Sequence, residues 1–217
     1  MSERCIVLGA GGHGKVVIDA LLVAGGLTPI GILDTNSALH HSVICGVKVL
    51  GGDDLMPHLL VDGVWKAICG VGGISDNRPR KAVIALARGN GFEVCGLIHP
   101  AAYVSRFAKI HGAAQIFAGA HVGPSAEIED GTIINTHAVI DHDCIVKAFA
   151  HIAPGAILGG GVTVGTMAHI GSGATIRQNI KIGAHAVVGA GAVVVRDVAE
   201  GDVVVGVPAR SMSISQQ

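Results

Sequence analysis

The sequence is poor in aromatic residues and in charge. Of its 217 residues, 3% are Phe, Trp or Tyr and 14% are charged, whereas 50% are hydrophobic and 33 are glycine. A conventional globular core contains more large aromatic rings, so we expect an interior of Val, Ile and Ala in narrow layers of strand. Low charge with high apolar content also argues against intrinsic disorder. The length allows one ordinary domain or two small ones.

An excess of charge of one sign and a long apolar run are also missing. The 15 basic and 16 acidic residues give a net charge of −1, so no basic surplus exists to bind nucleic acid or an anionic membrane. Every longer apolar stretch is interrupted by Gly, Asp or His, so we expect no transmembrane helix. The sequence reaches a glycine loop at Gly9, too soon for the apolar segment of a signal peptide.

Paired cysteines are absent as well. The five cysteines are an odd number without a disulfide or metal-binding spacing. We therefore predict small buried thiols in a reducing compartment, and hence a cytoplasmic protein. They are Cys5, Cys45, Cys69, Cys95 and Cys144.

The second half of the sequence carries a repeat of six residues. From Ile98 to Val194 every sixth residue is aliphatic, and a small residue stands four places after most of them. This period fits neither an α-helix nor a simple strand, but it fits a chain that forms a short strand, turns a corner and repeats. Three strands would close a triangular coil of about eighteen residues, with the aliphatic residues inside. We interpret the glycines that directly follow them, such as Gly165 and Gly171, as relieving backbone strain at the corners.

This repeat resembles that of the hexapeptide-repeat acyltransferases. The resemblance implies that residues 98–217 form a left-handed parallel β-helix, that the protein is a homotrimer, and that acetyl-CoA binds between neighbouring helices. The segment Val205–Arg210 is similar to the tail motif that closes many of these domains.

Residues 1–97 lack the repeat and alternate strands with helices. Such an order predicts a small parallel sheet flanked by helices. The expected strands begin at Cys5, Ile30 and Trp65, and the expected helices cover residues 16–23 and 79–88.

A glycine-rich loop follows the first expected strand. Gly9-x-Gly11-x-x-Gly14 opens the first helix, and Asp34 stands at the end of the next strand. This arrangement lets backbone N–H groups approach a pyrophosphate. The stretch also approximates a P-loop, but Val16 stands where Ser or Thr would bind magnesium, which excludes an NTPase. The segment is about half the length of a dinucleotide domain. We therefore predict a half-Rossmann domain for one nucleotide, the alternative being a purely structural turn.

The combination of the two parts resembles the bacterial N-acetyltransferases of nucleotide-linked 4-amino sugars, with sialic-acid O-acetyltransferases as relatives. The resemblance rests on the loop Gly9–Lys15, the strand end at Asp34 and the β-helix. It implies that Gly12, His13 and Lys15 face the nucleotide sugar and that Asp34 contacts its base or ribose. Some relatives carry a second acid where Thr35 stands, so the base preference stays open.

One histidine stands between two acids, at Asp141-His142-Asp143, on what the repeat predicts to be the outer side of a strand. A neighbouring carboxylate raises the basicity of an imidazole and can select its tautomer. Acyl transfer to an amine requires a base, and histidine suits this role at neutral pH. The resemblance implies that His142 is the base, that Asp143 orients it and that Asn135 lies near the sugar. A solvated polar strand is the alternative.

The other histidines of the repeat fall at positions expected on its surface. They are His99, His111, His121, His137, His151, His169 and His185. None forms a specific metal-ligand motif, so we expect no metal. A stacked pair, His151 and His169, would be the alternative metal site.

The resemblance also implies a coenzyme site. His151 would contact the acetyl group or the pantetheine, and an imidazole N–H there could stabilise the oxyanion. Backbone atoms of Gly160, Ser172 and Ala190 would line the cleft. Arg210 would meet the phosphates, although a solvated charge explains it equally well.

The leading hypothesis is an acetyl-CoA-dependent N-acetyltransferase that acts on a nucleotide-linked 4-amino-4,6-dideoxy sugar by direct attack. No cysteine matches a nucleophile motif, so no covalent intermediate is required. The alternatives are a sugar or sialic-acid O-acetyltransferase and a non-catalytic scaffold or metal-dependent β-helix enzyme. The sequence leaves open the nucleoside (UDP, GDP or dTDP), the sugar stereochemistry and the glycan pathway.

Overall fold

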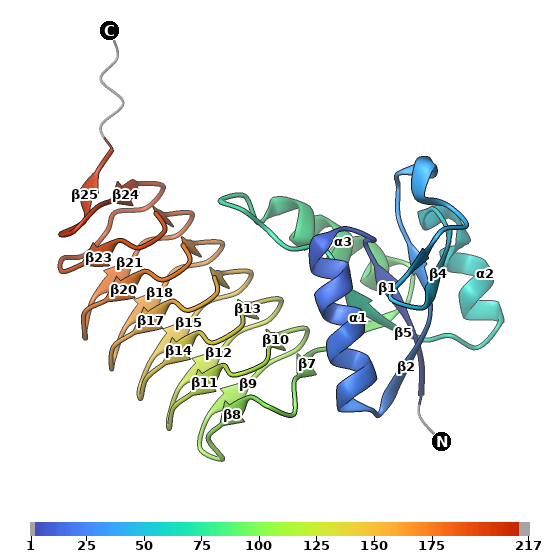
Figure 1. The fold of residues 1–217 in the computed structure, drawn as a ribbon, viewed down its shortest axis with the longest axis horizontal. Helices are drawn as coiled ribbons and strands as arrows, with labels where there is room; N and C mark the ends of the chain where they lie inside the picture. The colour runs from blue at the N-terminus through green and yellow to red at the C-terminus, as the bar shows by residue number, and fades with distance from the viewer. Residues whose placement is uncertain (1–2, 213–217) are drawn as a thin grey trace, which may run out of the picture. The chain divides into compact units, whose positions relative to one another are not determined.

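A computed structural model describes residues 3–212 (Figure 1). The chain divides into two compact units, residues 1–73 with 78–100, and residues 74–77 with 101–217. Within the described range, no helix is both long enough and apolar enough to cross a membrane.

The first unit is built on a mainly parallel sheet with strand order β3-β4-β2-β1-β5-β6. Only β3 runs antiparallel to its neighbour. The strands are β1 (Glu3–Leu8), β2 (Leu27–Leu33), β3 (Val43–Ile44), β4 (Val47–Gly51), β5 (Lys66–Cys69) and β6 (Glu93–Val94), followed by β7 (Leu97–Ile98). The helices are α1 (Gly12–Ala24), α2 (Met56–Val61) and α3 (Arg78–Gly89), with short 3-10 turns at Ser37–Leu39 and Asp53–Leu55.

The sheet forms because its central strand is apolar on both faces. Cys5 to Leu8 of β1 are all buried, as expected for a strand covered on both sides. Helix α1 buries one side of its surface, including Val17, Ile18 and Leu21. The three expected strands and two expected helices are present, whereas β4 and α2 were not predicted. Val47 and Val49 alternate with exposed Lys48 in β4, a pattern too short to stand out.

The second unit is a parallel β-helix with three faces. Among β8 to β23, paired strands are one coil and eighteen residues apart, as Ile133 pairs with His151. The first face contains β10 (Gln115–Ile116), β13 (Ile133–Ile134), β16 (His151–Ile152), β19 (His169–Ile170) and β22 (Val187–Val188), which β24 (Val203–Val205) and β25 (Arg210–Ser211) extend. The second contains β8 (Tyr103–Val104), β11 (His121–Val122), β14 (Val139–Ile140), β17 (Ile157–Leu158), β20 (Thr175–Ile176) and β23 (Val193–Val194). The third contains β9 (Lys109–Ile110), β12 (Glu127–Ile128), β15 (Ile145–Val146), β18 (Thr163–Val164) and β21 (Lys181–Ile182).

The interior of this helix consists of the predicted aliphatic series and the small residues between its members. Every member from Ile116 to Val194 is buried, together with alanines such as Ala138 and Ala150. The first member of the series differs, because Ile98 is 46% exposed and is not enclosed as predicted.

The corners of the coils also correct the interpretation of glycine. The left-handed backbone falls three residues after an inward residue, as at Ser125, Asp143 and Asn179. The glycines directly after an inward residue, such as Gly171, do not have a positive φ. They are needed because the next coil approaches closely. A Cβ at Gly171 would lie 2.6 Å from the backbone nitrogen of Ala190.

The segment Ile74–Asn77 is joined to the β-helix by a buried side chain. Asn77 is 2% exposed. Its Nδ2 donates to the carbonyl oxygens of Met167 and Ala168, at 3.0 and 3.3 Å. These bonds attach a segment from the first half of the sequence to the coil that leads into β19.

Candidate active site

The first unit has a pocket at the carboxyl ends of its parallel strands. Its volume is about 70 Å³. Strand β1 lies between β2 and β5, and the chain reaches these two neighbours in opposite directions from it. Ligands of open α/β sheets bind at such a switch point. The lining residues are Leu8, Gly9, Leu33, Asp34, Thr35, Asp53, Val71 and Val83.

The glycines of the predicted loop have two different roles. Gly14 is buried, and a Cβ there would collide with the carbonyl oxygen of Gly9, so this glycine lets helix α1 pack against the loop. Gly11 and Gly12 instead have nothing within 4 Å of an added Cβ. They leave open space where the unpaired N–H groups of a helix N-terminus can receive an anion. Lys15 is exposed one turn into the helix.

Asp34 holds this loop in place. Its two carboxylate oxygens accept the backbone N–H groups of Ala10 at 2.7 Å and Asn36 at 2.8 Å. Each oxygen keeps a lone pair for a ligand hydroxyl. Asp34 therefore lines the pocket and also has a structural task.

Asp53 lines the same pocket and was missed by sequence reasoning. Burial, reinforced by the nearby charges of Asp34 and Asp54, raises its pKa above the ordinary value. It follows β4, a strand that was not recognised, so no pattern pointed to it.

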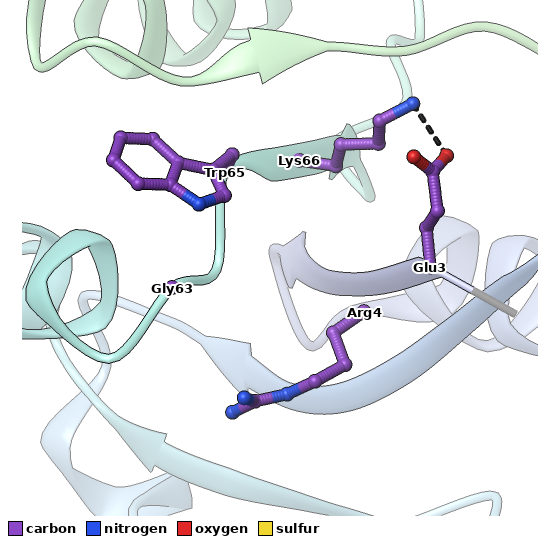
Figure 2. Close-up of a pocket in the computed structure, with 5 residues that line it drawn as sticks. All are labelled: Glu3, Arg4, Gly63, Trp65 and Lys66. Carbon is purple, nitrogen blue, oxygen red and sulfur yellow. Dashed lines mark ion pairs between the residues drawn. The ribbon is translucent and has the colours of Figure 1, made fainter. Parts of the chain in front are cut away.

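A larger pocket lies at the opposite edge of the sheet, where β1 and β5 begin (Figure 2). It measures about 360 Å³ and is lined by Glu3, Arg4, Gly63, Trp65 and Lys66. The Lys66 ammonium is paired with Glu3 at 2.6 Å. Because this edge holds the amino ends of the strands and the lysine charge is neutralised, it suits a nucleotide phosphate less well than the glycine loop.

In the β-helix, His142 and Asp143 lie on the turn after β14, not on a strand as predicted. The chain leaves the strand after Ile140 because Asp143 adopts a left-handed backbone with φ 58°. This turn projects both side chains into solvent, with 58% of His142 and 64% of Asp143 exposed. The Asp141 carboxylate accepts the backbone N–H of His142 at 2.7 Å and so stabilises the turn.

The histidine is arranged as a base. Its Nδ1 lies 2.6 Å from Oδ2 of Asp143. An ionised carboxylate only accepts, so Nδ1 carries the proton and Nε2 keeps its lone pair. The bond to Asp143 and the charge of Asp141 raise the pKa of His142 above its ordinary value.

Gly160, one coil later, lies against this imidazole. A Cβ at Gly160 would lie 2.6 Å from both Cε1 and Nε2 of His142. The residue predicted to line the coenzyme cleft therefore also determines where the imidazole can lie.

His151 and His169 are 7% and 9% exposed, which corrects the prediction that both are surface residues. Their rings meet edge to face, with centroids 5.0 Å apart. Nε2 of His151 also lies 3.1 Å from Nδ2 of Asn135, which joins two predicted site residues. Across residues 3–212, no group of three or more His, Cys, Asp or Glu side chains could hold a metal.

The chain is similar to known proteins. Residues 4–86 match the family model described as the PglD N-terminal domain. Perosamine N-acetyltransferase from Caulobacter crescentus, solved with CoA and GDP-perosamine and with a histidine replaced by asparagine, is 36% identical over 97% of both chains, with a TM-score of 0.90. The acetyltransferase domain of PglB from Neisseria gonorrhoeae, solved with acetyl-CoA, is 37% identical over 98% of this chain and 100% of that one, with a TM-score of 0.89.

The chain belongs to the hexapeptide-repeat sugar N-acetyltransferases. The predicted family is therefore confirmed, as are the fold class, an α/β domain followed by a left-handed β-helix, and the assignment as an acyltransferase. WeeI from Acinetobacter baumannii, at 22% identity and a TM-score of 0.80 over 97% of this chain, shares the fold.

In this acetyltransferase the predicted β-helix residues lie on two different corners. His142 and Gly160 lie on turns between the second and third faces, which we name the histidine corner. Asn135, Ser172 and Ala190 lie on turns between the first and second faces, which we name the asparagine corner. The two corners are opposite edges of one face, up to about 20 Å apart for six residues of extended chain.

Arg210 is exposed on β25, at the end of the helix, and its guanidinium donates to the carbonyl oxygen of Ala209 at 2.9 Å. The structure thus brings Asn135 together with His151, and Gly160 together with His142, while Arg210 lies apart from both pairs.

Proposed function

We propose that this protein transfers an acetyl group from acetyl-CoA to the amine of a nucleotide-linked 4-amino-4,6-dideoxy sugar. The observation that carries the proposal is His142, with Nδ1 bonded to Asp143 and the Nε2 lone pair available. Two relatives support the substrates, because one was crystallised with CoA and GDP-perosamine and the other with acetyl-CoA.

The chemistry follows from this geometry. The neutral amine attacks the thioester carbonyl carbon and forms the C–N bond, while His142 takes a proton from the nitrogen through Nε2. The tetrahedral intermediate then breaks its C–S bond, and the proton on His142 passes to the leaving sulfur. No enzyme thiol takes part. Cys144, the cysteine nearest in sequence, is buried, and burial raises its pKa, which disfavours the thiolate.

The nucleotide binds, in this proposal, at the carboxyl edge of the first unit. Gly12 and His13 contribute the N-terminus of α1, Lys15 contributes charge, and Asp34 accepts from the ribose or base. Small open glycines and a helix N-terminus support a diphosphate there.

Acetyl-CoA, in turn, lies along the β-helix beside Gly160, Ser172 and Ala190, with His151 near its acyl end and Arg210 near its phosphates. The two groups of residues lie at opposite edges of one face. This separation supports a homotrimer in which the histidine corner of one subunit faces the asparagine corner of the next. The five free thiols suit a cytoplasmic location.

Calorimetric titration with UDP, GDP and dTDP, with and without acetyl-CoA, tests the two binding sites. The nucleotide that binds then selects the 4-amino sugar for an acetylation assay. Amide formation supports the proposal. Acetyl-CoA binding without any nucleotide binding would contradict the proposal and favour a free sugar as the acceptor. A product acetylated on a hydroxyl would also contradict the proposal.

Mixed assemblies test the shared site. His142→Ala and Asn135→Ala would each impair the same site from a different corner. If neighbouring subunits share the site, co-expression of both variants restores about a quarter of the sites at random mixing. If each chain has a complete site of its own, the mixture stays as inactive as its parents.

A further inference from the structure

The buried pair His151 and His169 has no place in the acid–base chemistry described above. Both residues point outward from the first face of the β-helix, and they are register partners on β16 and β19. The perpendicular arrangement of their rings, at 82°, fixes the plane of His151. The remaining question is which of its two ring nitrogens carries the proton.

The side chain of Asn135 answers this question, because its own orientation is determined. The backbone N–H of Thr136 donates to Oδ1 of Asn135 at 2.8 Å. A backbone N–H can only donate, so the oxygen of the amide must face Thr136 and the NH₂ group must face the other way. The other direction is toward His151.

The NH₂ group of Asn135 meets Nε2 of His151 at 3.1 Å. An amide NH₂ can only donate, so this bond requires a lone pair on Nε2. A proton there would place two donors against each other. We propose that Asn135 holds His151 in its neutral form with the proton on Nδ1.

This inference rests on the proposed function only for its catalytic consequence. His142 and His151 would share one tautomer but use it differently, because Nε2 of His142 keeps its lone pair for the substrate and Nε2 of His151 gives it to Asn135. His151 is then not a second base. Asn135 is a positioning residue that acts through His151.

The experiment is ¹⁵N NMR of ligand-free protein labelled at histidine. Substitution His151→Gln identifies the signals of His151 by their loss. We expect an Nε2 signal of the unprotonated type and an Nδ1 signal of the protonated type. The reverse assignment in the wild-type protein would overturn the proposal, and this result needs no variant of Asn135.

Substitution Asn135→Asp then replaces the donor that faces Nε2 of His151 with an acceptor. Aspartate has nearly the same shape but presents only acceptors, so we expect His151 to gain a proton on Nε2. Asn179→Asp, the same change at an exposed turn residue, serves as the matched control and should leave the His151 signals unchanged. An unchanged His151 spectrum in a folded Asn135→Asp protein would contradict the proposal.

Kinetics of the same variant separate positioning from general damage. We expect kcat of Asn135→Asp to fall by at least tenfold, while the acidic limb of the pH profile, set by His142 on the other corner, keeps its position. A rate equal to wild type would show that the tautomer has no catalytic role. Because the NMR result is obtained without substrates, it stands or falls separately from the acetyl-transfer proposal.

Discussion

The two corners of the β-helix place the same side chain in opposite environments. On the histidine corner, His142 is exposed and bonded to a carboxylate, which raises its pKa. Beside the asparagine corner, His151 is buried and bonded to the NH₂ group of an amide, which can only donate. A carboxylate stabilises the imidazolium, whereas an amide NH₂ stabilises the neutral ring. The partner of each histidine, rather than the residue type, therefore determines which one can exchange a proton.

Removing the base should have the largest effect. We expect His142→Ala to lower kcat by about 10²- to 10⁴-fold, the usual contribution of a general base. The KM for the nucleotide sugar should change little, since the nucleotide binds in the other unit. Steady-state kinetics with the true substrate measure both values. A kcat close to that of the wild-type enzyme would remove His142 from the mechanism.

Removing the partner of the base should have a smaller effect with a characteristic pH dependence. The raised pKa keeps His142 protonated, and unable to accept a proton, up to a higher pH than a free imidazole. Asp143→Asn removes the first cause of this shift, so the pKa falls and the acidic limb of the rate profile moves to lower pH. Asp141→Asn should move it in the same direction by less. A limb that stays in place in both variants would show that another group controls it.

Displacing the imidazole of His142 should lower kcat by a smaller factor than these changes. Gly160→Ala puts a methyl group 2.6 Å from Cε1 and Nε2 of His142, without backbone strain, since Gly160 has no positive φ. We expect the ring to turn aside and kcat to fall about tenfold, because small errors in position are costly in catalysis. Gly89→Ala, where an added Cβ meets nothing within 4 Å, is the matched control. Equal activity of the two variants would mean that the ring adjusts without loss.

The smallest effect is expected from the thiol next to the catalytic turn. Cys144 fills an interior position that alanine occupies in the six-residue repeats before and after it, at Ala138 and Ala150. Cys144→Ala should therefore leave kcat within about twofold and cost at most about 1 kcal/mol of stability, measured by denaturant unfolding. A large loss of kcat in the folded variant would instead indicate a covalent thioester intermediate.

The sequence predicted the features that depend on a repeated physical rule. An inward aliphatic residue at every sixth position indicates a β-helix whatever the residues between, and the glycine loop with Asp34 indicated the pocket of the first unit. Features set by local geometry were harder to predict. The six-residue repeat predicts the spacing of the strands. It does not show that the left-handed backbone of Asp143 ends the strand before His142.

Burial by distant parts of the chain could not be predicted from the sequence either. His121 and His151 occupy the same place in the six-residue repeat, yet His121 is exposed and His151 is buried. Asp53 was missed because the strand before it, β4, was not recognised. Whether a side chain is buried depends on which surfaces of the folded chain meet, and no spacing in the sequence encodes this burial.

The left-handed turn has a consequence for how such an enzyme can change. Ser125, Asp143, Gly161 and Asn179 all occupy this same conformation, on successive turns of the histidine corner. The fold therefore offers several equivalent platforms for a His–Asp pair, stacked about 4.8 Å apart. Only the identity of the side chains determines which platform is catalytic. Moving the pair by one coil would shift the position of the base along the axis of the β-helix while the backbone stayed unchanged.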